Sequence, residues 1–277
     1  MQQKEISHRH KKIFYRAIGE GPVVVLLHGV PFDGSLWSNQ YQALPGFKLI
    51  IPDLPGVGKS EMIEDMSMEG MAECIKEMIV HETASLFFKT GEPHSVIVIG
   101  HSMGGYITLA LAEMHPELLN GFGLFHSSAY ADSEERKEGR KKTIQLIQEK
   151  GVEEFANTSV PNLFSSVTKQ QNPGLVDEEI AYARNFSAET LVNYQTAMMQ
   201  RKDRREVLER ATVPVLFILG QSDAVVPLKD GLEQGSLGDL SYFHVLESAG
   251  HVGMKEQPNE TNSILLNYLR NTCRYTP

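Results

Sequence analysis

The chain has 277 residues and a formal net charge of −9 at pH 7, with 26 Lys and Arg against 35 Asp and Glu. This length allows one large domain, or one domain with an insertion, to bury a full core without disulfides or metal ions. A hydrophobic content of 41% and a charged content of 22% exclude a disordered or fibrous chain. The acidic charge, without a basic patch, argues against nucleic acid or an anionic membrane as a partner.

Two cysteines, Cys74 and Cys273, lie far apart in the sequence and belong to no metal-spaced pair. We therefore expect two free thiols in a reducing compartment. The N-terminus is polar and lacks the apolar stretch of a signal peptide. The longest apolar runs are about strand length, well short of the roughly 20 residues that a spanning helix needs. The sequence thus predicts a soluble, cytoplasmic protein and leaves its oligomeric state open.

Short apolar runs that end at turn residues recur through the first half of the chain. They are typical of strands buried on both faces of a parallel sheet. The four runs are Val23–Leu27, Lys48–Ile51, Ser95–Ile99 and Gly121–Phe125. Helical patterns lie between them, at Met66–Val80 and Gly104–Met114. This alternation predicts an α/β fold built on a doubly wound, mostly parallel sheet.

The pattern changes near Ser127. From Ala131 to Arg210 we find no strand pattern. A charged amphipathic helix begins near Ser133, and Ser187 is a typical N-cap for a further helix. We therefore predict an all-helical cap at residues 127–208.

Strand-like runs return at Val213–Leu219 and Tyr242–Leu246, and the helical pattern Glu260–Asn271 follows them. These elements are expected to complete the sheet that the first segment begins. We predict that residues 1–126 and 209–277 together form the core domain around the inserted cap.

The sequence Gly-His-Ser-Met-Gly at residues 100–104 fits the pattern G-x-S-x-G. A buried strand leads into it and an apolar helix start follows, which is the setting that a nucleophilic serine on a sharp strand-to-helix turn requires. The glycines allow strained backbone without side-chain collisions. Ser102 is therefore the candidate nucleophile, and the alternative is a serine that only caps the following helix.

A serine hydroxyl is a weak nucleophile at neutral pH and needs a base that is oriented by an acid. Asp223 follows the strand-like run that ends at Leu219, and His251 lies in a glycine-containing loop after the next run. We predict Asp223 as the acid and His251 as the base. The main alternative acid is Asp132, which comes after the run that ends at Phe125.

The other histidines compete with His251 for the role of base. His101 is fixed beside the nucleophile and is expected to point elsewhere, and His126 ends a strand but precedes the acid. Five others are expected in a polar N-terminal tail or in surface helices and loops: His8, His10, His81, His94 and His115.

The predicted reaction also needs N–H donors for the developing oxyanion. The first is the backbone N–H of Met103, directly after the nucleophile. The second is expected from the loop after the first apolar run, where Pro31 has no N–H and Gly29 permits a close approach. We therefore assign it to Val30. The alternative is an ordinary turn around a buried His28.

Five segments, in this order, resemble the α/β-hydrolase family in the branch that carries a helical cap. They are HGVPFDGSLW, DLPGVGKS, GHSMGG, GQSDAVVP and SAGHVGMKEQP. The resemblance implies the α/β-hydrolase fold, a triad of Ser102, Asp223 and His251, and an oxyanion hole formed by Val30 and Met103. Haloalkane dehalogenases and epoxide hydrolases of this fold use an aspartate nucleophile, so the serine excludes their chemistry.

We expect a serine hydrolase that cleaves a small carboxylic ester, lactone or related acyl bond through an acyl-enzyme, with no metal or organic cofactor. Phe32, Trp37 and His126 are predicted to face the substrate pocket. A C–C bond hydrolase or a perhydrolase would use the same triad, and a non-enzymatic ligand receptor can share the fold. Apolar cap residues are candidates for the pocket roof: Phe155, Leu163, Phe164, Tyr194 and Met198.

One motif favours another class of protein. Gly58-Lys59-Ser60 ends a loop after an apolar run, as in a phosphate-binding loop. The full pattern needs glycine at position 53, where Asp53 would repel phosphate, and Pro55 removes a backbone donor. The sequence therefore favours the hydrolase hypothesis over nucleotide binding.

Overall fold

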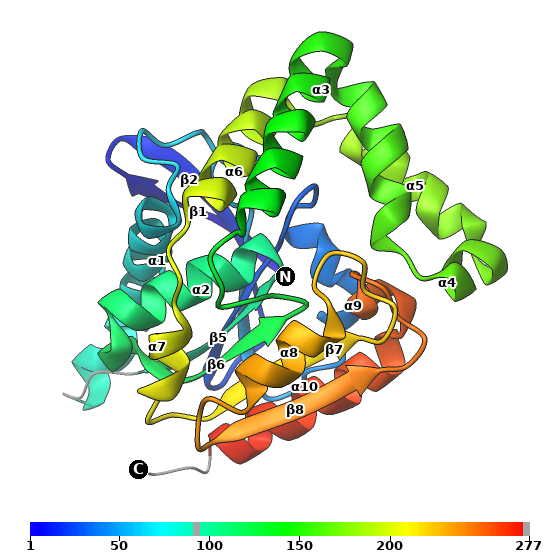
Figure 1. Cartoon of the computed structure of the whole chain (residues 1–277). Coiled ribbons are helices and arrows are strands. Elements are labelled where there is room, and N and C mark those ends of the chain that lie inside the picture. Colours follow the sequence, from blue (N-terminus) through cyan, green and yellow to red (C-terminus); the bar gives the residue numbers. More distant parts are fainter. Residues whose placement is uncertain (91–94, 274–277) are drawn as a thin grey trace.

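The structure is a computed structural model that describes residues 1–90 and 95–273. Its sheet has eight strands in the order β1-β2-β4-β3-β5-β6-β7-β8 (Figure 1). The strands are β1 (Gln2–His8), β2 (Lys11–Ile18), β3 (Val23–Leu27), β4 (Lys48–Pro52), β5 (Val96–His101), β6 (Leu119–Phe125), β7 (Val215–Gly220) and β8 (Ser241–Leu246). β2 runs antiparallel to both of its neighbours, and the later pairs are parallel. The predicted α/β class is confirmed.

No sequence pattern predicts the first two strands. His8 and His10 are expected in a polar tail, but β1 and β2 form a hairpin, and His8 is buried against Glu77. β1 is an edge strand, and most of its side chains are exposed. Its polar composition therefore concealed it, because an edge strand can bury one row of side chains only in part.

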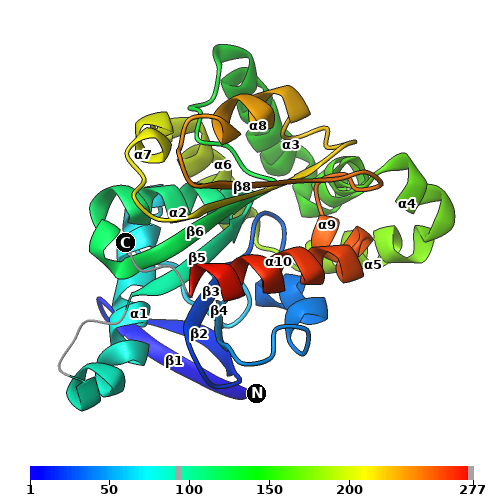
Figure 2. The ribbon, with the colours of Figure 1, turned by 90° about the horizontal axis from the view of Figure 1, so that it is seen from below.

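Helices cover both faces of the sheet. They are α1 (Met68–Thr90), α2 (Met103–Met114), α3 (Glu134–Ser159), α4 (Ser166–Gln171), α5 (Pro173–Ala183), α6 (Ala188–Gln200), α7 (Arg205–Glu209), α8 (Leu228–Gly235), α9 (Gly253–Glu256) and α10 (Pro258–Thr272), with short 3₁₀ segments at Gly34–Gln40, Pro116–Leu118 and Val160–Leu163. Alternate residues of β3 face opposite layers. Val25 belongs to the cluster that includes α1 and α2, and Val24 to the cluster that includes α10. Figure 2 shows the strands between these two layers.

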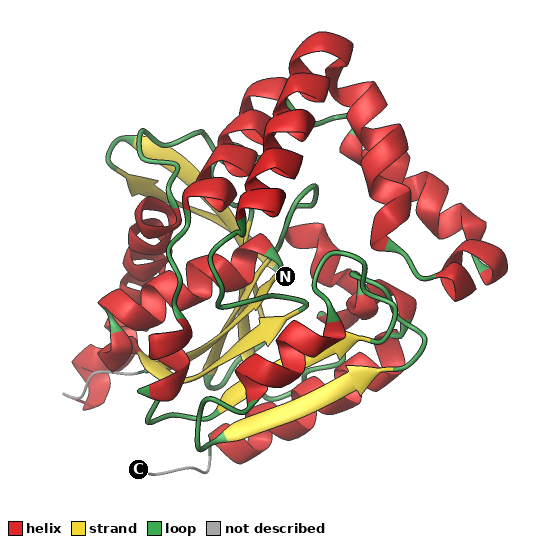
Figure 3. Cartoon of the chain, in the orientation of Figure 1, coloured by secondary structure: helices red, strands yellow, loops and turns green. Residues whose placement is uncertain are grey.

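The segment between β6 and β7 is helical, with no strand among its residues (Figure 3). The predicted helix at Ser133 extends from Glu134 to Ser159 with a kink at Gly151, and Ser187 caps α6 by accepting a bond from the Thr190 N–H. The boundaries at residues 127 and 208 stay a prediction.

Both cysteines are free, Cys74 in the core and Cys273 at the surface. Among the described residues, no helix combines the length and the apolar character that crossing a membrane requires.

Candidate active site

Ser102 lies on the tight turn between β5 and α2 with a φ of 51°. This left-handed conformation is strained for a residue with a side chain. A Cβ on Gly100 would lie 2.2 Å from the Gly104 carbonyl carbon, and a Cβ on Gly104 would lie 2.7 Å from the Leu27 carbonyl oxygen. The turn therefore needs both glycines. The Ser102 hydroxyl makes no capping bond to α2, so the geometry does not favour a capping role.

The three residues predicted as a triad meet at the carboxyl edge of the sheet. His251 Nε2 lies 2.9 Å from Ser102 Oγ, and His251 Nδ1 lies 2.8 Å from Asp223 Oδ2. All three side chains are buried. The chain thus places a nucleophile, a base and an acid in one hydrogen-bonded line. Their catalytic roles stay a prediction.

Asp223 and His251 are held by further bonds. Asp223 Oδ1 accepts from the backbone N–H groups of Val225 and Val226, at 2.8 and 2.9 Å. The His251 N–H donates to the Leu163 carbonyl at 2.7 Å, and His101 Nε2 donates to the His251 carbonyl at 2.7 Å. A residue of the helical segment therefore helps to position the candidate base.

Asp223 is a carboxylate at neutral pH. Burial alone would raise the pKa of its carboxyl group, but the charge of His251 and the polar contacts from His126 and His251 outweigh burial and hold this pKa well below its usual range. A permanent carboxylate is what orients a histidine and stabilises it when it gains a proton. Burial, together with the neighbouring His251 and His126, lowers the pKa of His101 well below its usual range.

The alternative residues lie elsewhere. Asp132 binds Arg140 and Arg201 with its two carboxylate oxygens, so its charge is engaged away from His251. Of the histidines expected at the surface, His10 and His81 are exposed and His115 is half-buried, whereas His94 lies outside the described residues.

The predicted oxyanion loop lies against the nucleophile. A Cβ on Gly29 would come within 2.8 Å of Ser102 Cβ, so the two backbones approach as closely as glycine allows. Val30 lines the same cavity as Ser102. In the part of the chain that the structure describes, no hydrogen bond takes up the backbone N–H of Val30 or Met103. Both donors are available to an oxyanion, and their assignment stays a prediction.

A cavity of about 480 Å³ opens in front of Ser102 and His251. Of the apolar cap residues expected to roof the pocket, Phe155, Leu163 and Met198 line it. Phe164 and Tyr194 do not: both are buried, and the Tyr194 hydroxyl donates to the Pro55 carbonyl at 2.8 Å. The cavity thus lies between the core and the helical segment.

The expectation that Phe32, Trp37 and His126 face this cavity needs correction. None belongs to its wall, and each is at most 2% exposed. Trp37 packs edge-on against Phe125 with 5.6 Å between ring centroids, and His126 lies behind the triad against Asp223. Side chains near strand ends alternate between the two faces of a sheet, and the sequence does not show which of them remain uncovered.

Further residues around the site are not predicted from the sequence. Ser127 Oγ donates to the Ser102 carbonyl at 2.7 Å, a contact that no sequence pattern reveals. Arg136 and Arg140 of α3 line the cavity. Their i, i+4 spacing, which places two side chains on one helix face, is a signal that could have revealed them.

The loop that ends in Gly58-Lys59-Ser60 closes on Asp53. A Cβ on Gly58 would lie 2.2 Å from Asp53 Oδ2, the Lys59 N–H donates to the same oxygen at 3.1 Å, and Ser60 Oγ donates to the Asp53 carbonyl at 2.6 Å. Arg16 also binds this carboxylate, at 2.5 Å. An anion of the chain itself therefore occupies the place of a phosphate, which argues against nucleotide binding here.

His126, Asp223 and His251 are the described residues that bring three potential metal ligands together, with ligand atoms within 4.8 Å of one another. Most of these atoms already have a partner, although His126 Nδ1 makes no hydrogen bond among the described residues. His251 Nε2 contacts Ser102, and His126 Nε2 accepts a bond from the Gly253 N–H at 3.0 Å. The cluster suits proton transfer, and we assign no metal to it.

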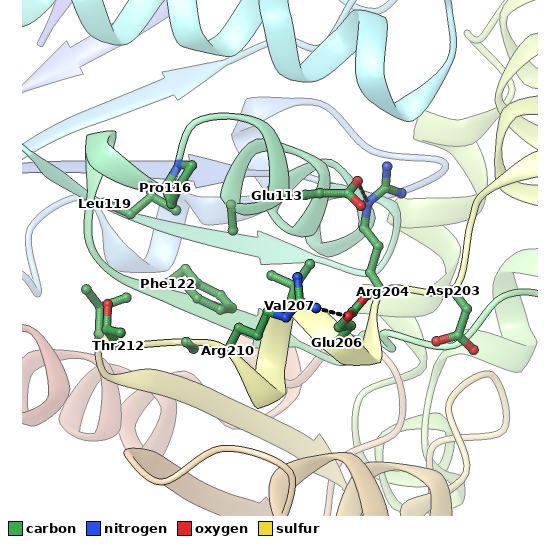
Figure 4. A pocket seen from close by; sticks show the side chains of 13 residues that line it. Glu113, Pro116, Leu119, Phe122, Asp203, Arg204, Glu206, Val207, Arg210 and Thr212 are labelled. Carbon is green, nitrogen blue, oxygen red and sulfur yellow. Dashed lines mark hydrogen bonds and ion pairs between the residues drawn. The ribbon is translucent and has the colours of Figure 1, made fainter.

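A second cavity, of about 270 Å³, lies between α7, the end of α2 and the start of β6 (Figure 4). Its wall combines apolar side chains such as Phe122 and Val207 with the ion pair of Arg204 and Glu113, whose closest atoms are 3.0 Å apart. No serine, cysteine or histidine is among its described lining residues. It therefore offers no second site for the predicted chemistry.

Comparison with known proteins gives a consistent result. Residues 24–264 match the model of the alpha/beta hydrolase family. The chain is 25% identical to the pimeloyl-[acyl-carrier protein] methyl ester esterase of Yersinia pseudotuberculosis, with 93% of this chain and 97% of that protein aligned. It is 27% identical to the 2-hydroxy-6-oxo-6-phenylhexa-2,4-dienoate hydrolase of Comamonas testosteroni, with 93% and 91% aligned. A malate-bound thermophilic esterase from Thermogutta terrifontis has a similar structure, with a TM-score of 0.87, 27% identity, and 98% and 99% of the two chains covered.

Proposed function

The chain belongs to the alpha/beta hydrolase family, and on that premise we propose that it is a serine hydrolase that cleaves a carboxylic ester, lactone or related acyl bond of a small molecule. The observation that carries the proposal is the hydrogen-bonded line from Asp223 through His251 to Ser102 Oγ, at the wall of a cavity. The methyl ester esterase and the thermophilic esterase among its relatives support ester chemistry.

The reaction begins when Ser102 Oγ attacks the substrate carbonyl and His251 Nε2 takes the hydroxyl proton. The carbonyl oxygen becomes an oxyanion, which accepts hydrogen bonds from the Val30 and Met103 N–H groups. Asp223 stabilises the protonated His251. The tetrahedral intermediate collapses to an acyl-enzyme as the C–O bond breaks, and His251 returns its proton to the leaving alcohol.

Water then attacks the acyl-enzyme. His251 removes a proton from this water and delivers it to Ser102 Oγ as the carboxylic acid leaves. Every proton passes through one imidazole, so the two halves of the reaction balance without a cofactor. We propose that the helical cap at residues 127–208 bounds the cavity and selects substrates, since Phe155 and Met198 line it.

The test is hydrolysis of p-nitrophenyl esters from acetate to octanoate. Ser102→Ala should lower kcat by about 10³-fold or more while the melting temperature stays close to that of the wild type. Ser38→Ala is the matched control, because Ser38 is exposed and away from the cavity. Equal turnover by Ser102→Ala and the wild type would refute the mechanism.

C–C bond cleavage is the second candidate, and one relative favours it, the hydrolase from Comamonas testosteroni. Loss of the absorbance of 2-hydroxy-6-oxo-6-phenylhexa-2,4-dienoate, abolished by Ser102→Ala, would assign it. A perhydrolase would instead form peracid from acetate and hydrogen peroxide. A receptor on the same fold would show no turnover with either class of compound and a large ligand-induced rise in melting temperature.

A further inference from the structure

The cavity in front of Ser102 has a cationic wall. Two arginines line it, Arg136 and Arg140, one turn apart on α3, which packs against α6 (Figure 1). No Asp or Glu is among its described lining residues. The chain as a whole carries a net charge of −9, so the sign of this wall is opposite to that of the molecule.

The carboxylate nearest to these arginines does not neutralise them. Asp132 is the shared partner of Arg140 and Arg201, so two guanidinium charges face one carboxylate. Arg201 is buried and also lies over the Tyr106 ring, 4.0 Å from its centroid. Arg136 has no carboxylate within 4.0 Å among the described residues. Arg201 and Asp132 lie behind the wall. With them included, three arginines face one carboxylate, so this region carries an excess of about two positive charges.

Part of each guanidinium remains available to a ligand. A guanidinium has five N–H donors in a planar fork. Arg140 uses Nε for Asp132 and Nη1 for Gln195, whereas Arg136 uses Nη2 for the Val225 carbonyl. In the described part of the chain, Nη2 of Arg140 and both Nε and Nη1 of Arg136 make no hydrogen bond. Such donors match the geometry of a carboxylate.

We infer that the substrate of this enzyme carries a carboxylate group away from the bond that is cleaved, and that Arg136 and Arg140 bind it. The inference rests on the proposed function, because it places this anion in the cavity where Ser102 would attack. The arginines act as specificity residues, since they position the substrate while the triad performs the chemistry.

The test compares pairs of esters that differ in one charge. Monomethyl glutarate against dimethyl glutarate places the anion on the acyl side, and acetoxyacetate against methyl acetoxyacetate places it on the alcohol side. The wild type should favour the anion of at least one pair by about 10- to 100-fold in kcat/KM. Arg136→Gln should reduce this preference by about tenfold, because kcat/KM falls more for the anionic ester than for its neutral partner.

Lys137→Gln and Lys141→Gln are the matched controls. Each removes one positive charge from α3 next to an arginine, but both lysines pair with glutamates of the same helix and neither lines the cavity. Both should keep the wild-type preference. Arg140→Gln should reduce the preference for the anionic ester, and Arg140→Lys should restore part of this preference. The comparison separates recognition of the charge from a general loss of the Asp132 contact.

Binding to Ser102→Ala separates this inference from the proposed function. Calorimetry should show tighter binding of the anionic ester than of its neutral partner, and Arg136→Gln in that background should remove the difference. If the anion binds tighter but the wild type hydrolyses neither ester, the carboxylate site stands and the proposed function fails. Equal binding and equal turnover of the two esters, or an effect of the lysine controls as large as that of Arg136→Gln, would overturn the inference.

Discussion

His126 Nδ1 lies 3.2 Å from the Asp223 oxygen, Oδ2, that also contacts His251. The Gly253 N–H donates to the other ring nitrogen of His126, so that nitrogen accepts, and the proton of the neutral ring must lie on Nδ1. Burial lowers the pKa of His126, which favours this neutral form. The N–H of His126 Nδ1 thus lies beside the candidate acid and stabilises its negative charge, although the contact is not aligned as a hydrogen bond.

Replacement of His126 should change the pH profile as well as the rate. His126→Asn keeps a residue that tolerates the positive φ of this position, 49°, but removes the imidazole from Asp223. Asp223 then shares its negative charge with His251 alone, so it stabilises a protonated His251 better. We expect the acidic limb of kcat/KM to move to higher pH, so that turnover falls at acidic pH. A purely structural role would lower the melting temperature and leave the limb unmoved.

Gly29→Ala should impair activity more than stability. The new Cβ would meet Ser102 Cβ and His101 Nδ1 at 2.8 Å, so the loop that carries Val30 must move away from the nucleophile. Loss of one oxyanion donor lowers kcat by about 10² to 10³-fold. Ester kinetics and a thermal melt of the same preparation measure both effects. Gly174→Ala is the control, because it does not line the cavity and its Cβ would meet only Asn172 Oδ1, at 3.9 Å, and a comparable loss of kcat there would contradict the explanation.

The Asp53 loop offers a stability prediction and a test of nucleotide binding. Asp53→Asn would leave Arg16 without its close partner and weaken the bond from the Lys59 N–H. Removal of one member of a buried ion pair destabilises the fold by about 3–5 kcal/mol, which urea unfolding would measure.

We expect ATP with Mg²⁺ to leave the melting temperature of the wild type unchanged. A saturable rise would revive the nucleotide hypothesis.

Glu82 on α1 should make the fold acid-sensitive. Burial alone would raise its pKa, but hydrogen bonds from Lys48, Tyr15 and Lys4 outweigh burial and bring it to about 2, below the ordinary 4.5. A group whose pKa falls on folding stabilises the fold above its unfolded pKa, and this contribution disappears as pH drops from 4.5 toward 2. Glu82→Gln should therefore have a lower free energy of unfolding at pH 7. Between pH 5 and 3 its free energy of unfolding should also fall less steeply with pH, because unfolding then takes up about one proton fewer. An unchanged slope would contradict this account.

Much of the fold and of the candidate site could be predicted from local pattern. The apolar runs before Ser102 and Asp223 became β5 and β7, and the glycines around Ser102 predicted a turn that only small residues allow. These features depend on residues close together in the chain, where steric limits and hydrophobic periodicity act directly. The edge strand β1 escaped because its side chains are mostly exposed and its pattern is correspondingly weak.

The order along the chain of the candidate nucleophile, acid and base, and the tight turn at Ser102, could be predicted from the sequence alone. Which side chains share a space depends on the tertiary packing. It placed His126 behind Asp223 and turned the arginines of α3 toward the cavity. The angle at which a helix packs over a sheet follows from many side-chain contacts between residues distant in the chain. No local pattern therefore shows which face of the helix meets the site.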